Sequence, residues 1–375
     1  MTAPTYLDPR SNATLPLTQP RWRSETGGPM MVSAQAGIAR GDIDRSVRSL
    51  WRYAKALPLA VPDPITMGEG CTPLIERRWQ GARALMKLEW FAPTGSFKDR
   101  GASVMLSVLR QQGIRHVLED SSGNGGAAVA AYAVAGGMKV KILVPAYTQP
   151  AKIVQMRAVG AEVELVPGTR QDCSDEAERQ AESIFYASHN WQPFFLEGTK
   201  TLAYELWEDL GFEAPDNVIA PMGAGSNILG CWLGFNELLR RGEIKKMPRI
   251  FGSQPENCGP IAASFAAGVD IPVENRVEPT VAEGTAIAKP IRLMEVLGAL
   301  RGSGGGAVAV PEDEIVAALK GLAAMGLYTE PTSAQTAAAL TRLVKAGKIQ
   351  PEEKTVLVLT GSGLKATQKI GDLFG

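Results

Sequence analysis

The stretch Val117-Leu118-Glu119-Asp120-Ser121-Ser122-Gly123-Asn124-Gly125-Gly126 connects a short β-rich run to an Ala-rich run, and this alternation decides the fold. The Ala-rich run continues to residue 135. Two further β-rich runs follow at 140–145 and 162–166, separated by a helical stretch at 150–159. Short β-rich runs that alternate with longer helical stretches are typical of βαβ units, whose strands pair in parallel beneath helices. The pattern predicts an α/β fold with a parallel sheet flanked by helices.

A second series of β-rich runs lies further along the chain, at residues 217–221, 249–252 and 355–360. A chain of 375 residues has room for two domains of ordinary size. We therefore expect two open, twisted, mostly parallel sheets flanked by helices, with the active site between the two domains.

The first part of the chain differs in composition from the rest. Residues 1 to about 43 are rich in Pro, Gly, Ser and Thr and have little periodicity. This composition favours an extended arm, with regular structure starting near Asp44. The glycine-rich residues 302–306 favour a flexible loop.

The charge balance disfavours several classes of partner. Lys and Arg together number 39, as do Asp and Glu, so the net charge is zero and no field gathers a polyanion. For this reason we expect no nucleic-acid partner. We also expect no membrane partner, because in addition no apolar run approaches the length that spans a bilayer. The first ten residues contain no basic stretch followed by an apolar core, so the expected location is the cytoplasm.

Cysteine and histidine are too few and too scattered to indicate a metal site. The four cysteines, at positions 71, 173, 231 and 258, form no close pair, and the only histidines are His116 and His189. Zinc and redox motifs need such residues at short spacing. We therefore predict no metal and reduced, structural cysteines, and we expect the chemistry to use an organic cofactor.

Lys98 is the strongest candidate for a reactive side chain. It lies in Pro93-Thr94-Gly95-Ser96-Phe97-Lys98-Asp99-Arg100-Gly101, where Ser96 and Asp99 have the spacing of a capping box. This spacing predicts Lys98 near the second position of a helix. The helix dipole disfavours a cation there and favours the neutral amine, which is the form that attacks an aldehyde. The alternative is a solvated lysine in an ordinary capped helix.

Three glycine-containing loops follow predicted strands. Residues 223–227 precede the apolar stretch 228–239, so their backbone N–H groups form an anion cradle of phosphate size. A dinucleotide fingerprint would need glycine where this chain has Ile228, which disfavours nicotinamide binding. The loops at 121–126 and 360–365 have the same place after their strands, although each alone also fits an ordinary turn. Since ligands bind at the carboxyl ends of strands in open α/β sheets, we expect these loops to converge with Lys98.

Nine segments in order resemble the fold-type II pyridoxal-phosphate enzymes, whose fold is that of the tryptophan synthase β chain. The resemblance is greatest to the threonine synthase branch and covers roughly residues 51–375. The segments are Trp51-Arg52-Tyr53, Gly68-Glu69-Gly70-Cys71-Thr72-Pro73-Leu74, Lys87-Leu88-Glu89, the Lys98 stretch, Ser122-Gly123-Asn124, Glu197-Gly198-Thr199-Lys200-Thr201, the Gly223 loop, Glu330-Pro331-Thr332-Ser333 and Thr360-Gly361-Ser362-Gly363-Leu364-Lys365. The resemblance implies a lyase-type enzyme with pyridoxal 5'-phosphate as cofactor and a small L-amino acid as substrate.

The resemblance also implies roles for the candidate residues. Lys98 would form a Schiff base with the cofactor and then move protons at substrate carbons. Asn124 would hydrogen-bond the cofactor's ring hydroxyl oxygen, and Thr360 would face the pyridine nitrogen. The phosphate would be held by Gly223, Ala224, Gly225, Ser226 and Asn227, and the substrate carboxylate by Ser121, Ser122 and Gly123. A hydroxyl beside the pyridine nitrogen makes the ring a weaker electron sink than a carboxylate would, which favours elimination and replacement over transamination.

The expected domain organisation has three parts. We expect an N-terminal arm at 1–50, a large cofactor-binding domain formed by 51–98 and 200–375, and a small α/β domain at 99–199. A homodimer is the expected assembly, as the commonest default.

Two departures from the family pattern leave the substrate open. Threonine synthases carry an arginine two positions before the Glu of the Glu-Gly-Gln-Lys-Thr motif, which resembles a clamp for the phosphate of O-phosphohomoserine. This chain has Phe195 there, and a phenyl ring cannot replace a bidentate guanidinium. In addition, Gly125 and Gly126 stand where threonine synthases usually place hydroxyl-bearing residues.

Two explanations of these departures remain. The enzyme makes threonine with another basic group, such as Lys200 or Arg157, or it is an ammonia-lyase or dehydratase that acts on threonine, serine or another β-substituted amino acid. Core packing of Phe194 and Phe195 would remove the clamp in either case. The rivals from other classes are a non-catalytic amino-acid sensor that binds the same cofactor, and a nicotinamide dehydrogenase.

Overall fold

The computed structural model describes residues 3–375, and the chain divides into two compact units. The first unit consists of the residues up to Gly70 together with Lys98–Thr199, and the second of Cys71–Phe97 together with Lys200–Gly375. In this division residues 51–70 lie with the first unit, whereas the sequence placed them in the larger domain. The assignment of a cofactor-binding and a small domain stays a prediction.

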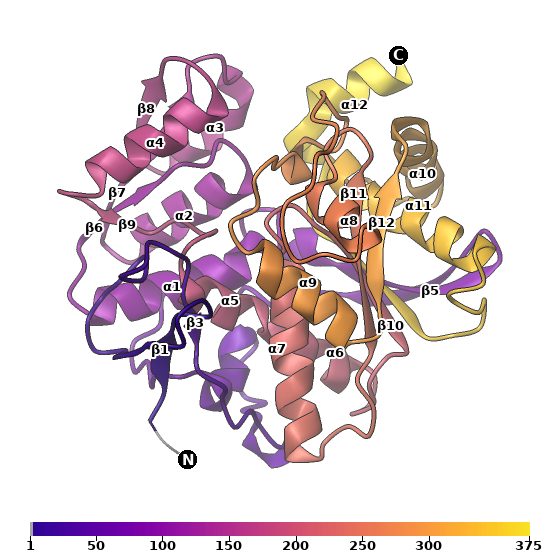
Figure 1. The fold of residues 1–375 in the computed structure, drawn as a ribbon, viewed down its shortest axis with the longest axis horizontal. Helices are drawn as coiled ribbons and strands as arrows, with labels where there is room; N and C mark the ends of the chain where they lie inside the picture. Colours follow the sequence, from indigo (N-terminus) through magenta and orange to yellow (C-terminus); the bar gives the residue numbers. More distant parts are fainter. Residues whose placement is uncertain (1–2) are drawn as a thin grey trace. The chain divides into compact units, whose positions relative to one another are not determined.

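The first unit is built on a four-stranded parallel sheet of order β8-β7-β6-β9 (Figure 1). Its strands are β6 (His116–Glu119), β7 (Lys139–Pro145), β8 (Glu162–Val166) and β9 (Phe185–Tyr186). Its helices are α1 (Lys98–Gln111), α2 (Asn124–Ala135), α3 (Pro150–Ala158), α4 (Arg170–Gln180) and α5 (Pro193–Thr199), with two short 3-10 segments, η1 (Arg40–Asp42) and η2 (Leu50–Ala56).

Helices cover both faces of the central strands β6 and β7, which explains the buried apolar runs Val117-Leu118 and Ile142-Leu143-Val144, whereas the edge strand β8 is only partly buried. Val140 and Ile142 of β7 face the core that contains α1 and α2. Leu143, one position out of phase with them, faces Cys173 and Ala177 of α4. The period of two therefore sends alternate side chains to helices on opposite faces.

The prediction that regular structure starts near Asp44 was wrong, because the N-terminal arm already contains three short strands. The strands β1 (Thr5–Leu7), β2 (Thr14–Pro16) and β3 (Met31–Val32) form a small antiparallel sheet of order β2-β1-β3. Tyr6 of β1 is fully buried in the core of the first unit. Strands of two or three residues are too short to produce a recognisable period, which is why the sequence did not indicate them.

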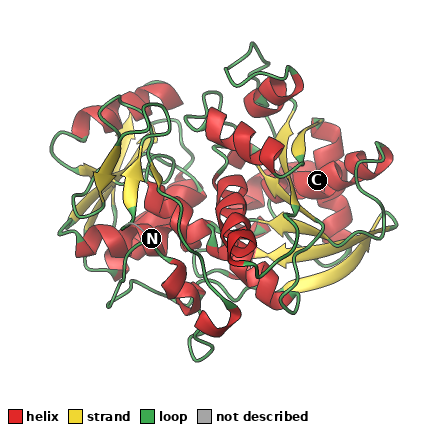
Figure 2. Cartoon of the chain, turned by 60° about the horizontal axis from the view of Figure 1, so that its bottom comes forward, coloured by secondary structure: helices red, strands yellow, loops and turns green. Residues whose placement is uncertain are grey.

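The second unit is built on a six-stranded sheet of order β12-β11-β10-β13-β5-β4. Its strands are β4 (Leu74–Trp79), β5 (Ala82–Leu88), β10 (Asn217–Pro221), β11 (Arg249–Pro255), β12 (Gly306–Val310) and β13 (Thr355–Leu359). Its helices are α6 (Thr201–Asp209), α7 (Ser226–Arg241), α8 (Pro260–Ala266), α9 (Leu293–Gly302), α10 (Glu312–Ala324), α11 (Pro331–Lys345) and α12 (Thr367–Phe374), with the 3-10 segments η3 (Glu89–Phe91), η4 (Glu283–Thr285) and η5 (Gly363–Ala366). Figure 2 shows strands flanked by helices in both units.

Only one pairing in this larger sheet is antiparallel. β4 and β5 form a hairpin in which Trp79 pairs with Ala82, so the loop consists of Gln80 and Gly81 alone. Both loop residues have positive φ, 48° and 87°, as a two-residue type I′ turn requires. The other pairings are parallel, which confirms the predicted α/β class with mostly parallel sheets.

The predicted glycine-rich loop after residue 301 is shorter than expected. Gly302 ends α9 and Gly306 begins β12, so only residues 303–305 connect them. Separately, no helix within residues 3–375 is both long and apolar enough to cross a membrane.

Candidate functional site

Lys98 is the first residue of α1, one position earlier than the capping box predicted. Ser96 forms a β-bridge with Gly361, and the Phe97 N–H donates a hydrogen bond to the Thr360 carbonyl oxygen at 2.9 Å. These pairings keep the chain extended up to the helix. The buried Ser96 hydroxyl has no hydrogen-bond partner among the described residues, so the predicted capping box is wrong. Lys98 is half-buried and stands at the helix end that carries partial positive charge.

Phe195 is the aromatic neighbour of the Lys98 amine. The Lys98 Nζ lies 5.5 Å from the centroid of the Phe195 ring, which is fully buried in α5. The ring packs where a Cβ on Gly101 would stand, so the glycine of the Lys98 stretch makes room for it. An apolar ring therefore lies beside the amine at the position where the family resemblance implied an arginine.

The Ser121–Asn124 loop connects β6 to α2, and Asn124 is the first residue of that helix. A Cβ on Gly126 would collide with the Ser121 carbonyl oxygen. A Cβ on Gly125 would lie 2.5 Å from Cε1 of His189. The two glycines that replace hydroxyl-bearing residues are thus required by crowding, and one of the crowding groups is His189.

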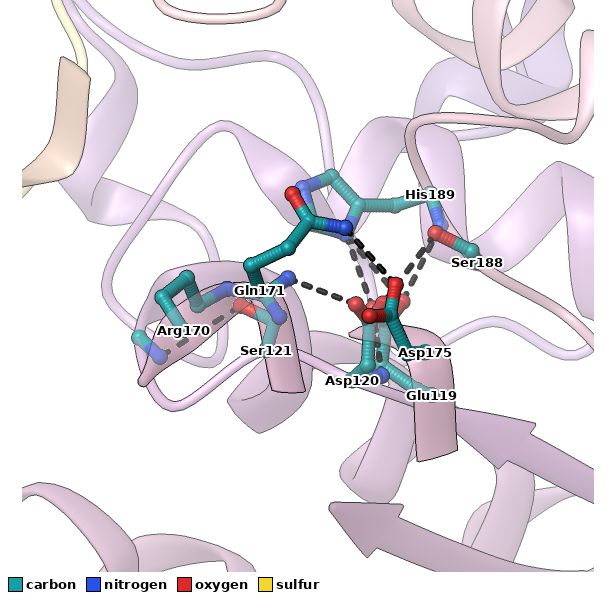
Figure 3. A network of polar contacts seen from close by, with 9 residues as sticks. Glu119, Asp120, Ser121, Arg170, Gln171, Asp175, Ser188 and His189 are labelled. Carbon is teal, nitrogen blue, oxygen red and sulfur yellow. Dashed lines mark hydrogen bonds and ion pairs between the residues drawn. The ribbon is translucent and has the colours of Figure 1, made fainter. Parts of the chain in front are cut away.

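His189 and Glu119 form a buried pair at the carboxyl end of the parallel strands (Figure 3). β9 pairs with β6 in parallel, Val117 opposite Phe185, so the segment after β9 runs beside Glu119. The Glu119 carboxylate lies 3.1 and 3.2 Å from His189 Nδ1, and its Oε2 also accepts the His189 backbone N–H at 3.0 Å. Burial lowers the pKa of His189 below 6.5, and the positive charge of Lys98 lowers it further, against the opposing effect of Glu119.

Sequence reasoning missed this pair. The available signal was an acidic residue at the end of an otherwise apolar buried strand, Val117-Leu118-Glu119, together with one of only two histidines. Buried carboxylates are almost always paired. The partner could not be chosen without knowing that β9 lies next to β6.

Asp120, the next residue, belongs to a second ion pair. Its Oδ2 lies 2.6 Å from a terminal nitrogen of Arg170, at the start of α4. Burial raises the pKa of the Asp120 carboxyl, but the guanidinium outweighs burial and the pKa lies below 3.8. Ser188 donates a longer hydrogen bond to Asp120 at 3.4 Å. Arg170 is therefore already neutralised by a buried carboxylate.

The Gly223–Asn227 loop lies in the second unit, between β10 and α7, and α7 begins at Ser226. Gly225 has φ of 89°, and a Cβ there would collide with Val296, so only glycine fits. Asn227, in the first turn of α7, is 2% exposed, and its side-chain amide oxygen and nitrogen have no hydrogen-bond partner among residues 3–375. Buried amides are normally satisfied, so this one fits a bound polar group, as do the N–H groups of the helix start.

Thr360 follows β13 in the same unit. Its hydroxyl lies 3.0 Å from the Ser333 hydroxyl, and the Ser333 oxygen accepts the backbone N–H groups of Thr360 and Gly361. β13 and β10 are neighbouring parallel strands, so Thr360 and the Gly223 loop lie at the same edge of one sheet. The predicted candidates therefore form two groups: Lys98 and the Ser121–Asn124 loop in the first unit, and the Gly223 loop with Thr360 in the second.

Neither of the two basic residues considered as a replacement clamp is well suited to that role. Lys200 is fully buried, and its Nζ lies 3.0 Å from Glu237. Arg157 is exposed at the end of α3, next to Met156, which is the residue that faces the core. The described residues thus give no support to these two cations as phosphate ligands.

The sequence is similar to those of curated threonine synthases. Among curated relatives, the threonine synthase of Methanocaldococcus jannaschii is 35% identical over 325 residues, 84% of this chain and 80% of the relative. The threonine synthase of Mycobacterium tuberculosis (strain ATCC 25618 / H37Rv) is 33% identical over 310 residues, 80% of this chain and 84% of the relative.

Solved structures show the same fold. The threonine deaminase of T.th. superposes with a TM-score of 0.67 at 27% identity, covering 78% of this chain and 92% of that one. The processed form of threonine deaminase isoform 2 from Solanum lycopersicum gives a TM-score of 0.68 at 24% identity, over 80% of this chain and 86% of that one.

The family model described as "Pyridoxal-phosphate dependent enzyme" matches residues 65–361. This range contains all the candidate residues, from Lys98 to Thr360. The predicted resemblance and the predicted cofactor are both confirmed. The chain belongs to the pyridoxal-phosphate dependent enzymes of fold type II, and its cofactor is pyridoxal phosphate.

Proposed function

We propose that this enzyme eliminates a group from Cβ of a small L-amino acid whose leaving group carries no phosphate, and thereby acts as an ammonia-lyase. The observation that carries the proposal is the Phe195 ring, 5.5 Å from the Lys98 amine, at the position where a phosphate-clamping arginine was expected. A buried phenyl ring offers no hydrogen bond to a phosphate. Loss of a charged hydrogen-bond partner typically costs about 1.5–3 kcal/mol of binding.

Lys98 is the proposed base of the reaction. Bound pyridoxal phosphate supplies an electron sink that stabilises negative charge at the substrate Cα. Lys98 removes the Cα proton, and its place at the first position of α1 favours the neutral amine that this requires. The Phe195 ring keeps water from one side of the amine, which protects the proton while it is held.

The remaining candidates bind and orient. The Gly223–Asn227 loop would hold the cofactor phosphate, and the unpartnered amide of Asn227 supports this role. Thr360, fixed by Ser333, would face the pyridine nitrogen, and Asn124 the ring hydroxyl oxygen. Ser121, Ser122 and Gly123 would hold the substrate carboxylate through hydroxyl and backbone N–H groups at the start of α2.

Threonine synthesis from O-phosphohomoserine is the second candidate. It is favoured by the curated relatives, which are threonine synthases at 33–35% identity over at least 80% of this chain. It would need a phosphate ligand in place of the missing arginine. The pairing of Lys200 with Glu237 and of Arg170 with Asp120 makes both cations poor substitutes.

A comparison of three substrates tests the proposal. The purified holoenzyme is given L-threonine, L-serine or O-phosphohomoserine, and ammonia, keto acid, phosphate and threonine are measured. We expect ammonia and keto acid in equal amounts from threonine or serine. Phosphate released together with threonine from O-phosphohomoserine would overturn the proposal in favour of the second candidate. A Lys98→Ala control should be inactive with all three.

A further inference from the structure

The imidazole of His189 is held in one orientation next to the residues proposed for catalysis. Nδ1 faces the Glu119 carboxylate at 3.1 and 3.2 Å, and the backbone N–H is bound to the same carboxylate (Figure 3). The ring centroid lies 5.5 Å from that of Phe195, the residue that also contacts the Lys98 amine. The ring also packs against Gly125, next to Asn124, where a Cβ would lie 2.5 Å from its Cε1.

The carboxylate determines which nitrogen carries the proton. Because Glu119 can only accept, a neutral His189 keeps its proton on Nδ1. Nε2 then presents a lone pair, and no residue within 3–375 hydrogen-bonds to it. His189 is 7% exposed and Glu119 is fully buried. In this pair the carboxylate orients the imidazole, and Nε2 is left to accept or donate a proton.

We infer that His189, oriented by Glu119, is the catalytic acid that protonates the leaving group, and that the substrate is therefore a β-hydroxy amino acid. This inference rests on the proposed elimination and names its substrate class. Hydroxide is a poor leaving group and must leave as water, which requires a proton donor in the transition state. A phosphate or a halide leaves as a stable anion and requires none.

The protons and electrons of the step balance within the site. The incoming amino acid loses one ammonium proton to the neutral Nε2 of His189. Lys98 then takes the Cα proton, and the electron pair of the Cα–H bond becomes the second bond between Cα and Cβ. The Cβ–O bond breaks with its electron pair on oxygen, the Nε2–H bond breaks, and its proton completes a water molecule.

The charges around His189 suit a group that is neutral at rest and protonated only transiently. Lys98 at the start of α1 disfavours the imidazolium, whereas Glu119 and Asp120 at the end of β6 favour it. Burial and the charge of Lys98 outweigh the two carboxylates, so the pKa of His189 lies below 6.5. When Lys98 is neutral, the two carboxylates stabilise the imidazolium that forms as His189 takes the ammonium proton. When Lys98 then takes the Cα proton, its positive charge favours transfer of the Nε2 proton to the leaving group.

The test compares leaving groups in a single variant. Holoenzyme with His189→Gln is assayed with L-serine, which loses a hydroxyl, and with β-chloro-L-alanine, which loses chloride. We expect kcat for serine to fall by about 10²–10⁴-fold, the usual contribution of a general acid. The rate with β-chloroalanine should stay within about fivefold, because chloride leaves without a proton. The matched control is His116→Gln, at the opposite end of β6, which should leave both rates unchanged.

A second measurement does not depend on turnover. The chain has only two histidines, so a histidine-selective ¹⁵N spectrum of the holoenzyme contains two imidazoles, and His116→Gln assigns them. His189 should carry its proton on Nδ1 at pH 8, and Glu119→Gln should shift the population toward Nε2. Glu119→Gln, which leaves the imidazole in place, should also reduce the serine rate more than the β-chloroalanine rate.

The outcomes separate this inference from the proposed function. Equal loss of both rates in His189→Gln and in Glu119→Gln, or an Nε2–H tautomer in the unaltered enzyme, overturns the role of His189 while the elimination stands. If the unaltered enzyme turns over neither serine nor β-chloroalanine, the proposed elimination itself fails. If His189→Gln does not fold, Glu119→Gln and the tautomer decide.

Discussion

Asn227 is the single residue whose environment most directly suggests a bound anion in the second unit. Its amide is buried in the first turn of α7 and has no hydrogen-bond partner in the described part of the chain, residues 3–375. Replacing it by Asp adds a negative charge where a phosphate would bind, and two charges about 4 Å apart interact by about 4 kcal/mol near a protein surface. We predict that Asn227→Asp weakens binding of pyridoxal phosphate more than tenfold, measured by titrating the apoenzyme and following absorbance.

The matched control for this prediction lies on the same helix. Asn236 is half-buried near the other end of α7, and its amide donates to the Trp232 carbonyl oxygen. Asn236→Asp adds the same charge far from the loop and should leave the cofactor affinity within about twofold, since surface charges are largely screened at this range. Equal affinities of the two variants would show that the loop does not hold the phosphate.

Residue types and local spacing were enough to predict part of the candidate site. Lys98 was indicated because it lies at the start of a helix, and the loops at 121–126 and 223–227 because each lies between a strand and a helix. His189 and Glu119 were not, because their pairing depends on which strand lies beside β6. The role of Gly125 could not be predicted either, because the side chain that leaves no room for a Cβ there belongs to His189, 64 positions away.

At the scale of elements, a cluster of charges joins β5 to α6, buried at Lys87 and Glu205 and one-third exposed at Asp209. Lys87 of β5 is fully buried, and its Nζ lies 2.6 Å from Glu205 and 2.7 Å from Asp209 of α6. Removing the cation would leave the carboxylates uncompensated. We predict that Lys87→Met lowers the free energy of unfolding by about 3–5 kcal/mol, measured by urea denaturation.

An exposed ion pair provides the comparison. Lys354 lies 2.6 Å from Glu213, with side-chain exposures of 36% and 66%. Lys354→Met should cost about 1 kcal/mol or less, because exposed pairs contribute little. If Lys87→Met lowered the free energy of unfolding no more than Lys354→Met does, the charge cluster of Lys87 would not hold β5 to α6.

The buried pair of His189 and Glu119, at the ends of β9 and β6, should make the free energy of unfolding depend on pH. The pKa of His189 is depressed by burial in the folded chain, so below pH 6.5 the unfolded chain binds the proton more readily. The stabilisation is complete above pH 6.5 and is lost as the pH falls through the folded pKa. We expect the urea midpoint to decrease between pH 7.5 and pH 5.5, and His189→Gln to reduce this decrease. An unchanged decrease in the variant would assign it to other groups.

The elements themselves were predictable where the chain is periodic. The strands β6, β7, β8, β10, β11 and β13 were predicted, because each is a β-rich run bounded by turns. The three N-terminal strands, the β4–β5 hairpin, β9 and β12 were not predicted. The N-terminal strands are too short to have a period, and β4 carries Glu76, Arg77 and Arg78 as an exposed edge strand does.

For the whole molecule, the fold class and the cofactor followed from an ordered set of motifs, whereas the substrate did not. Motifs that bind the cofactor are local and recur through the family. In our proposal Phe195 and His189 select the substrate. They act beside Lys98 and Glu119, which are distant in the sequence and approach them only in the folded chain. The expected homodimer stays a prediction, which sedimentation of the holoenzyme would test.

A covalent bond between Lys98 and the cofactor underlies every role proposed for the site. Borohydride reduction of the holoenzyme followed by proteolysis and mass spectrometry locates that bond. We predict a pyridoxyl-phosphate adduct on the peptide that contains Lys98 and loss of the adduct in Lys98→Ala. An adduct on another lysine, or no adduct on a holoenzyme that contains the cofactor, would contradict the assignment of Lys98.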